Sequence, residues 1–225
     1  FKERPIFDRA GATQIIVRDW NGDGRQDVLA LIAQGLESLV AFIQDEHGGF
    51  APRTLLQHHP AFGSSGFDLA DFDGDGRDDV VLSNGDFDYG MPERYFHGVR
   101  IFLNRGKDKF EKGYHFPLSG AYQVRAADFD KDGDQDVAVT SFTPSFRHSP
   151  VSNFFVLENQ GSLKFSAKTF RGSLAGRWLR LDVEDYDGDG DADIALGSYF
   201  EAPGIGAVIP ATQGDRWLAR PLGAL

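Results

Sequence analysis

Four segments of the chain alternate apolar and polar residues and then enter an acidic loop that contains glycine. Each segment has an apolar residue four and two positions before its loop: Ile15 and Val17, Phe67 and Leu69, Val124 and Ala126, Leu181 and Val183. A period of two residues indicates a strand with one buried face. We therefore predict that a strand enters each loop.

Further apolar stretches follow every loop. The second stretch of each repeat starts directly after the loop, at Val28, Val80, Val137 and Ile194. The third lies at Leu39–Ile43, Val99–Leu103, Phe154–Leu157 and, more faintly, Ala207–Ile209. Glycine, polar residues and an aromatic follow the first three of these, as a hairpin into a fourth strand requires. Four antiparallel strands per repeat make the blade of a β-propeller.

The loops repeat a nine-residue pattern at 19–27, 71–79, 128–136 and 185–193. A repeat period in this range is typical of propellers and solenoids. We predict an all-β fold in which residues 1–225 form a single β-propeller domain of four repeats, either a small ring or part of a larger propeller. Pro5–Phe7 precedes the predicted strand that enters the first loop, much as Thr54–Leu56 precedes the predicted strand that enters the second loop. It could therefore supply a strand that closes the ring, or belong to another blade.

The cleanest loop runs from Asp71 to Asp79 and carries acids at positions 1, 3, 5 and 9. With the backbone carbonyl of position 7, these oxygens suit Ca²⁺, which takes six to eight oxygen ligands, better than Mg²⁺, which prefers a tighter shell. Gly76 at position 6 permits the sharp reversal of the chain. A plain acidic turn would not need acids at the same positions in each copy, and crowded carboxylates without a cation repel one another.

An EF-hand begins with similar acids but needs a bidentate glutamate at position 12. This chain has Ala30, Leu82, Val139 and Leu196 there. The predicted flanking elements are also strands rather than helices. The loops are therefore not EF-hands.

The loop pattern, with an alternating strand before it and Val or Ile after it, resembles the FG-GAP or VCBS repeats. These repeats occur in integrin alpha-subunit propellers, in many secreted bacterial proteins and in some calcium-containing propeller lectins. The resemblance extends over nearly the whole chain and implies about four Ca²⁺ sites. Family propellers commonly have seven blades, so the four repeats here depart from that pattern.

The resemblance implies a ligand set for each loop, with a backbone carbonyl at position 7. The sets are Asp19, Asn21, Asp23, Arg25 and Asp27; Asp71, Asp73, Asp75, Arg77 and Asp79; Asp128, Asp130, Asp132, Asp134 and Asp136; and Asp185, Asp187, Asp189, Asp191 and Asp193. Asn21 replaces a carboxylate at position 3 of the first loop. We therefore expect that loop to bind calcium most weakly.

The charge and composition narrow the classes of function. More than half of the 34 acidic residues lie in the four loops, and the formal net charge is −11. Because nucleic-acid binding needs a basic surface, we expect no nucleic-acid partner. The chain has no cysteine, so thiolate zinc sites are excluded. We expect no membrane span, and weak calcium loops of this kind indicate an extracellular or cell-surface location, where calcium is about millimolar.

Two insertions between the second and third strands, 86–98 and 142–153, are expected opposite the calcium loops. Their candidate ligand-binding residues are Tyr89, Arg94, Tyr95, His97, Arg147 and His148. No phosphate loop or His-Glu-x-x-His pattern is present, which favours a protein without catalytic activity. We predict a calcium-stabilised module that binds a protein or glycan, with self-association if the ring is incomplete. The alternative is a carbohydrate-active protein, either a calcium-dependent lectin or a polysaccharide lyase.

Overall fold

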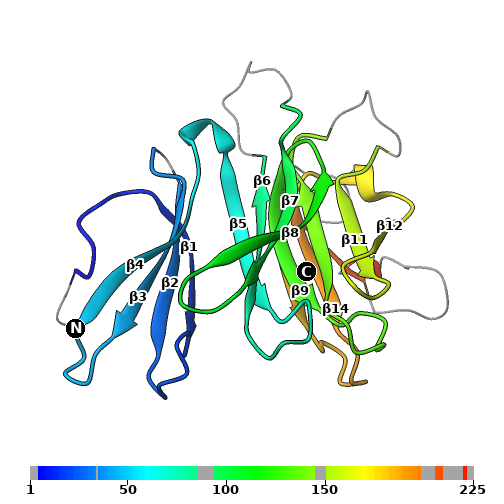
Figure 1. Cartoon of the computed structure of the whole chain (residues 1–225). Coiled ribbons are helices and arrows are strands. Elements are labelled where there is room, and N and C mark those ends of the chain that lie inside the picture. The colour runs from blue at the N-terminus through cyan, green and yellow to red at the C-terminus, as the bar shows by residue number, and fades with distance from the viewer. Residues whose placement is uncertain are drawn as a thin grey trace.

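The computed structural model describes residues 5–33, 35–85, 94–144 and 151–198, and the backbone of 206–209 and 220–221. Within these ranges the regular structure is β-strand, apart from two short 3-10 turns, η1 (Pro60–Phe62) and η2 (Ser173–Ala175). The strands form four antiparallel sheets, each with four strands in chain order (Figure 1). The all-β prediction, with one four-stranded sheet for each repeat, is confirmed.

The sheets are numbered in chain order. The first contains β1 (Ala12–Arg18), β2 (Asp27–Ile32), β3 (Ser38–Gln44) and β4 (Phe50–Gln57). The second contains β5 (Ser64–Ala70), β6 (Asp79–Asn84), β7 (Gly98–Asn104) and β8 (Phe110–Pro117). The third contains β9 (Ala121–Ala127), β10 (Asp136–Ser141), β11 (Phe154–Asn159) and β12 (Phe165–Lys168). The fourth contains β13 (Trp178–Glu184), β14 (Asp193–Ser198), β15 (Gly206–Ile209) and β16 (Arg220–Pro221).

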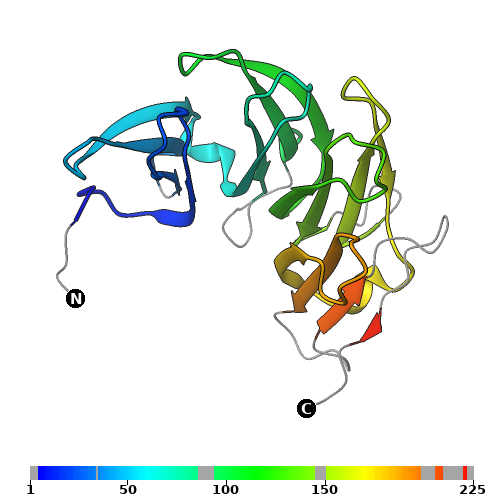
Figure 2. The ribbon, with the colours of Figure 1, turned by 90° about the horizontal axis from the view of Figure 1, so that it is seen from below.

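The four sheets follow one another along an arc, as Figure 2 shows. Consecutive first strands, β1, β5, β9 and β13, contact one another along the inside of the arc. The first and fourth sheets lie at the two ends of the arc, with a gap between them (Figure 2). Among the described residues no sheet closes on itself, so the arrangement is an open arc of blade-like sheets.

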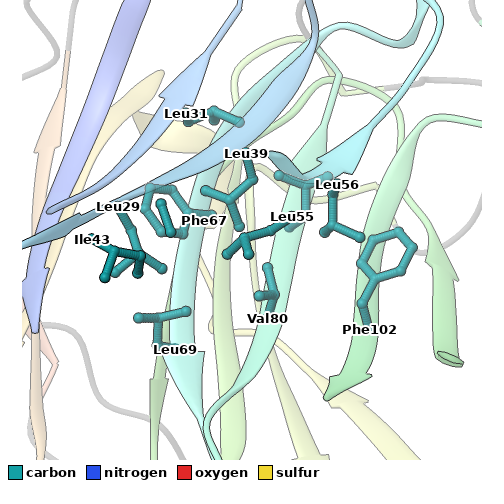
Figure 3. Close-up of a cluster of buried hydrophobic side chains, with 12 residues drawn as sticks. Leu29, Leu31, Leu39, Ile43, Leu55, Leu56, Phe67, Leu69, Val80 and Phe102 are labelled. Carbon is teal, nitrogen blue, oxygen red and sulfur yellow. The ribbon is translucent and has the colours of Figure 1, made fainter. Parts of the chain in front are cut away.

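Apolar side chains hold neighbouring sheets together. Here the front face of a sheet is the one turned towards the next sheet in the chain, and the back face is turned towards the preceding sheet. Between the first two sheets, Leu29, Leu31 and Leu39 pack against Phe67 and Val80 (Figure 3). These side chains are at most 1% exposed, and burying one such leucine or phenylalanine contributes about 1.5–3 kcal/mol.

The next two interfaces are built in the same way. Val81 and Ile101 of the second sheet pack in one core with Val124 and Val137 of the third. A further core joins the third sheet to the fourth and contains Phe154, Val156, Leu181 and Ile194. The second and third sheets therefore pack against a neighbouring sheet on both faces, which explains the nearly continuous apolar sequence of their middle strands.

The N-terminal segment lies against the back face of the first sheet. Phe7 makes an edge-to-face contact with Phe42, with ring centroids 5.2 Å apart. Ala30, Ile32 and Val40 belong to the same small core. Pro5–Phe7 forms no strand and joins no sheet in the described structure. The fourth sheet has its own outermost strand, β16, so in the described structure the N-terminal segment does not close a ring by adding a strand to that sheet. That it belongs to another blade stays a prediction.

Candidate metal centres

All four acidic loops join the first strand of a sheet to the second, as predicted. They lie together at one end of the sheets, at the bottom of Figure 1, and this end is called the loop end below. The first and second strands of each sheet pair so that the residue directly before the loop lies opposite position 9 of the loop. In the second sheet these residues are Ala70 and Asp79. The position-9 aspartate is therefore the first residue of the second strand.

The aspartate at position 1 folds the loop around its own carboxylate. Asp71 Oδ1 accepts hydrogen bonds from the backbone N–H of Gly74 and Asp75, at 2.8 and 3.1 Å. Asp71 Oδ2 accepts from Gly76 N at 2.7 Å. Gly76 has φ +81°, a left-handed conformation that glycine adopts without the strain of a Cβ atom. The first and fourth loops have the same three bonds to Asp19 and Asp185.

The aspartate at position 9 ties the loop to the sheet. Asp79 is fully buried, and its two oxygens accept from Phe72 N at 3.0 Å and from Asn104 N at 2.7 Å. Asp136 makes the equivalent bonds to Phe129 N and Asn159 N. Asp79 thus connects its own loop to the end of β7. The sequence suggested only a metal ligand here, because nothing local indicates a hydrogen bond to a residue 25 positions away.

Carboxylates from positions 1, 3 and 9 meet in three of the loops. In each group one oxygen from every residue lies within 4.8 Å of the others: Asp71, Asp73 and Asp79; Asp128, Asp130 and Asp136; and Asp185, Asp187 and Asp193. Oxygens this close suit a hard cation, which would lie among them and remove their mutual repulsion. The residues present therefore fit a divalent metal ion.

The first loop forms no such group of three carboxylates among the described residues, because its position 3 is Asn21. The Asn21 amide instead lies against position 5, with Nδ2 donating to Asp23 Oδ2 at 2.8 Å. Asn21 Oδ1 accepts from Asp23 N at 3.0 Å. The amide oxygen is still a possible ligand, but it brings no negative charge.

Arginine side chains lie on two of the position-5 carboxylates. Arg25 pairs with Asp23, and Arg77 pairs with Asp75. Each guanidinium also donates from Nε to a carbonyl at the end of the third strand, at 2.9 Å in both cases. These position-7 residues were expected to contribute only a carbonyl, so their side-chain role was missed. That the carboxylate of position 5 and the carbonyl of position 7 complete a metal shell stays a prediction.

Comparison with protein families agrees with this repeated geometry. The model of the FG-GAP-like repeat matches residues 11–82 and 83–139, which is more than half of the chain. The chain belongs to the FG-GAP-like repeat family. A search of curated proteins found no match to this FG-GAP-like chain. Across the described residues, no helix has the length and apolar character to cross a membrane.

In two of the FG-GAP-like loops, burial makes the position-9 carboxylates, Asp79 and Asp136, hard to ionise. It raises the pKa of Asp79 from 3.8 to about 6, against the lowering effect of its two backbone hydrogen bonds, and Asp73 and Asp75 raise it further. For the same reasons, with Asp130 and Asp132 as the charged neighbours, the pKa of Asp136 rises to about 7. A bound cation would favour the ionised form of both groups.

These shifts predict that the metal-free protein loses stability as the pH rises. The folded chain keeps protons on Asp79 and Asp136 that the unfolded chain, with pKa values near 3.8, has already released. The stability that these two protonated groups contribute is therefore full below the unfolded pKa of 3.8. It is lost as the pH rises through the folded pKa values, about 6 for Asp79 and about 7 for Asp136. Urea unfolding in excess chelator at a series of pH values would measure this. A free energy of unfolding that rises over this range would contradict the prediction.

The predicted ligand-binding residues lie at the end opposite the loops, as far as they are described. Tyr95 is 92% exposed, and Arg94 Cζ lies 5.7 Å from the ring centroid of Phe96. His97 is only 1% exposed, so its ring is not available at the surface. Tyr89, Arg147 and His148 lie outside the described residues. Whether the two insertions converge on one pocket therefore stays a prediction.

An aromatic group that the sequence did not indicate lies beside Tyr95. The rings of Phe62 and Phe96 are stacked with centroids 6.0 Å apart, and His58 stacks on Phe62 at 4.2 Å. Arg100 lies over Phe62 at 4.7 Å, a distance suited to a cation–π contact. These residues come from two segments, 58–62 and 95–100, that are separated in sequence, which explains why no local pattern joined them.

Proposed function

We propose that the loops bind Ca²⁺ and that the chain is a calcium-stabilised interaction module without catalytic activity that works outside the cell. The proposal rests on one observation: three separate loops each bring together the carboxylates of the same loop positions, 1, 3 and 9. The all-oxygen donor set and the flexible glycine-containing loops favour Ca²⁺ over Mg²⁺, which needs a near-ideal octahedral shell. FG-GAP repeats are found in extracellular interaction modules, which supports the proposed location.

Calcium would act here as a structural ion. When bound, it supplies positive charge that offsets the repulsion within each carboxylate group. The position-1 aspartate shapes the loop, and the position-9 aspartate holds the loop to the third strand of the same sheet. Because both residues also belong to the metal groups, binding of the ion would stabilise the folded sheet.

The partner would bind at the end opposite the loops. Tyr95 presents an almost fully exposed aromatic ring there, and Arg94 lies close to the Phe96 ring beside it. An exposed tyrosine and an arginine are residue types that are enriched in protein-binding surfaces. Most of the clustered carboxylates belong to the proposed metal sites. Carboxylates that bind a metal ion are poorly placed to act as a general acid or base.

Calorimetric titration of the metal-free protein with Ca²⁺ tests the proposal. We expect three stronger sites and one weaker site, because the first loop has one carboxylate fewer. In the variant Asn21→Asp the weak site should tighten by at least about fivefold, since two unit charges 4 Å apart in water attract by about 1 kcal/mol and Ca²⁺ carries two charges. Tyr95→Ala, a change at the opposite end, should leave the titration unchanged. Absence of binding at millimolar calcium would refute the proposal.

A further inference from the structure

The second loop carries positive charge on its carboxylates. Arg105, the first residue after β7, donates from its guanidinium Nη1 to Asp73 Oδ2 at 2.6 Å. The same nitrogen lies 3.5 Å from Asp75 Oδ2. Arg77 also pairs with Asp75. Two guanidinium groups therefore lie on positions 3 and 5 of this loop.

Arg105 is held beside the loop from two sides. Its Nε donates to Glu111 Oε2 at 3.0 Å, and Glu111 belongs to β8. The turn between β7 and β8 is closed by a backbone hydrogen bond from Arg105 N to Lys109 O at 2.8 Å. The positive charge of Arg105 is therefore fixed next to Asp73, which belongs to the metal group of the second loop.

The third loop is a matched comparison, because it also has aspartate at positions 1, 3, 5 and 9. The first residue after β11 is Gln160, whose N–H closes the same kind of turn onto Lys164 O at 2.7 Å. Gln160 therefore stands where the second sheet has Arg105, and position 7 is Asp134 rather than an arginine. In the described part of the chain, no ion pair involves the three-carboxylate group of this loop.

We propose that Arg105 is a built-in counter-ion of the second loop, which stabilises the metal-free loop and lowers its affinity for Ca²⁺ below that of the third loop. This inference rests on the proposed function, because it concerns the relative strength of the calcium sites. A guanidinium beside Asp73 offsets part of the repulsion among the carboxylates, and it repels a cation that enters the same group. Calcium therefore fills the third loop before the second.

Loss of the Arg105 charge should have opposite effects with and without calcium. Two unit charges 4 Å apart in water interact strongly enough to change a binding constant about fivefold, and Ca²⁺ carries two charges. Removing the charge should therefore tighten calcium binding by the second loop at least about fivefold. Without calcium the same change should lower the melting temperature, because the carboxylates lose a positive neighbour. A side chain that only supported the turn would lower stability in both conditions and leave the affinity unchanged.

Titration of the metal-free protein with CaCl₂, followed by ¹H–¹⁵N NMR, tests the proposal loop by loop. The position-6 glycines, Gly76 and Gly133, each donate their N–H to the position-1 aspartate and so report on their own loops. In wild type the Gly133 signal should reach its midpoint at a lower calcium concentration than the Gly76 signal. In Arg105→Gln the Gly76 midpoint should fall at least about fivefold, and the Gly133 midpoint should not change.

Two further variants serve as controls. Arg105→Lys keeps the positive charge, so its Gly76 midpoint should stay close to that of wild type. Arg53→Gln removes an exposed arginine that pairs with Asp108 of the same turn, at 3.6 Å, and makes no ion pair with a metal group. This variant should leave both midpoints unchanged. Thermal melts should show Arg105→Gln below wild type in chelator, with a smaller difference in excess calcium.

Two outcomes would overturn this inference while leaving calcium binding intact. One is equal midpoints for Gly76 and Gly133 in wild type, a comparison that needs no variant. The other is an Arg105→Gln variant whose Gly76 midpoint matches wild type. If neither glycine signal responded to millimolar calcium, the proposed function would fail together with this inference.

Discussion

Removing calcium from the purified protein with a chelator is expected to lower its melting temperature by roughly 10 °C. Calcium at ten times its dissociation constant stabilises the folded chain by about 1.4 kcal/mol per site, so three sites contribute about 4 kcal/mol. For a domain of this size, 1 kcal/mol shifts the melting temperature by about 2–4 °C. Thermal melts followed by circular dichroism, with calcium and with excess chelator, measure the shift.

Adding calcium back in excess over the chelator should restore the original melting temperature, whereas adding magnesium should restore only a small part of it. This comparison separates metal binding from any other effect of the chelator. A melting temperature that does not change in excess chelator would show that the carboxylate groups hold no structural ion. The chain would then have to tolerate three groups of crowded carboxylates, with the raised pKa values of Asp79 and Asp136.

The strand pattern of the fold could be predicted from the sequence because each strand carries its own signal. The alternation at Phe67 and Leu69 marks β5, and the apolar run 99–103 lies inside β7. The same signal does not show how many sheets stand side by side. Ile15 and Val17 follow the same alternation as Phe67 and Leu69, yet they are exposed, because only the packing partner decides the burial of a strand face.

The metal loops were predictable for a similar reason, since their ligands lie within nine residues. The spacing of Asp71, Asp73 and Asp79 was sufficient to place these residues in one group. Interactions with distant residues were not predictable. Arg105 comes directly after β7, 32 residues from Asp73 in the sequence. Its guanidinium donates a hydrogen bond to the Asp73 carboxylate at 2.6 Å. Only the folded sheet brings this pair together.

Replacing Asp136 by alanine is expected to destabilise the protein by roughly 2–6 kcal/mol, even without metal. The Asp136 side chain is buried and accepts from Phe129 N at 2.9 Å and from Asn159 N at 2.8 Å. The alanine variant leaves both N–H groups without an acceptor, and each unsatisfied buried group costs about 1–3 kcal/mol. Urea unfolding in excess chelator, compared with wild type, measures the loss.

Asp132→Ala is the matched control, because Asp132 is an exposed acid of the same loop whose Oδ1 accepts from Asp134 N at 2.9 Å. If Asp132 contributes mainly as a metal ligand, this variant should lose stability in calcium and little in chelator. Asp136→Ala should lose stability in both conditions. An Asp136→Ala variant that matches wild type in chelator would mean that position 9 acts through the ion alone.

Asp136→Asn separates the charge of position 9 from its hydrogen bonds. The amide has nearly the shape of the carboxylate, but its single oxygen can accept from only one of Phe129 N and Asn159 N, and its NH₂ group faces the other. Its stability in chelator should therefore fall between those of Asp136→Ala and wild type. If instead Asn matched wild type in chelator, the two backbone bonds would contribute little. The loop would then depend on the ion, rather than on Asp136, for its attachment to β11.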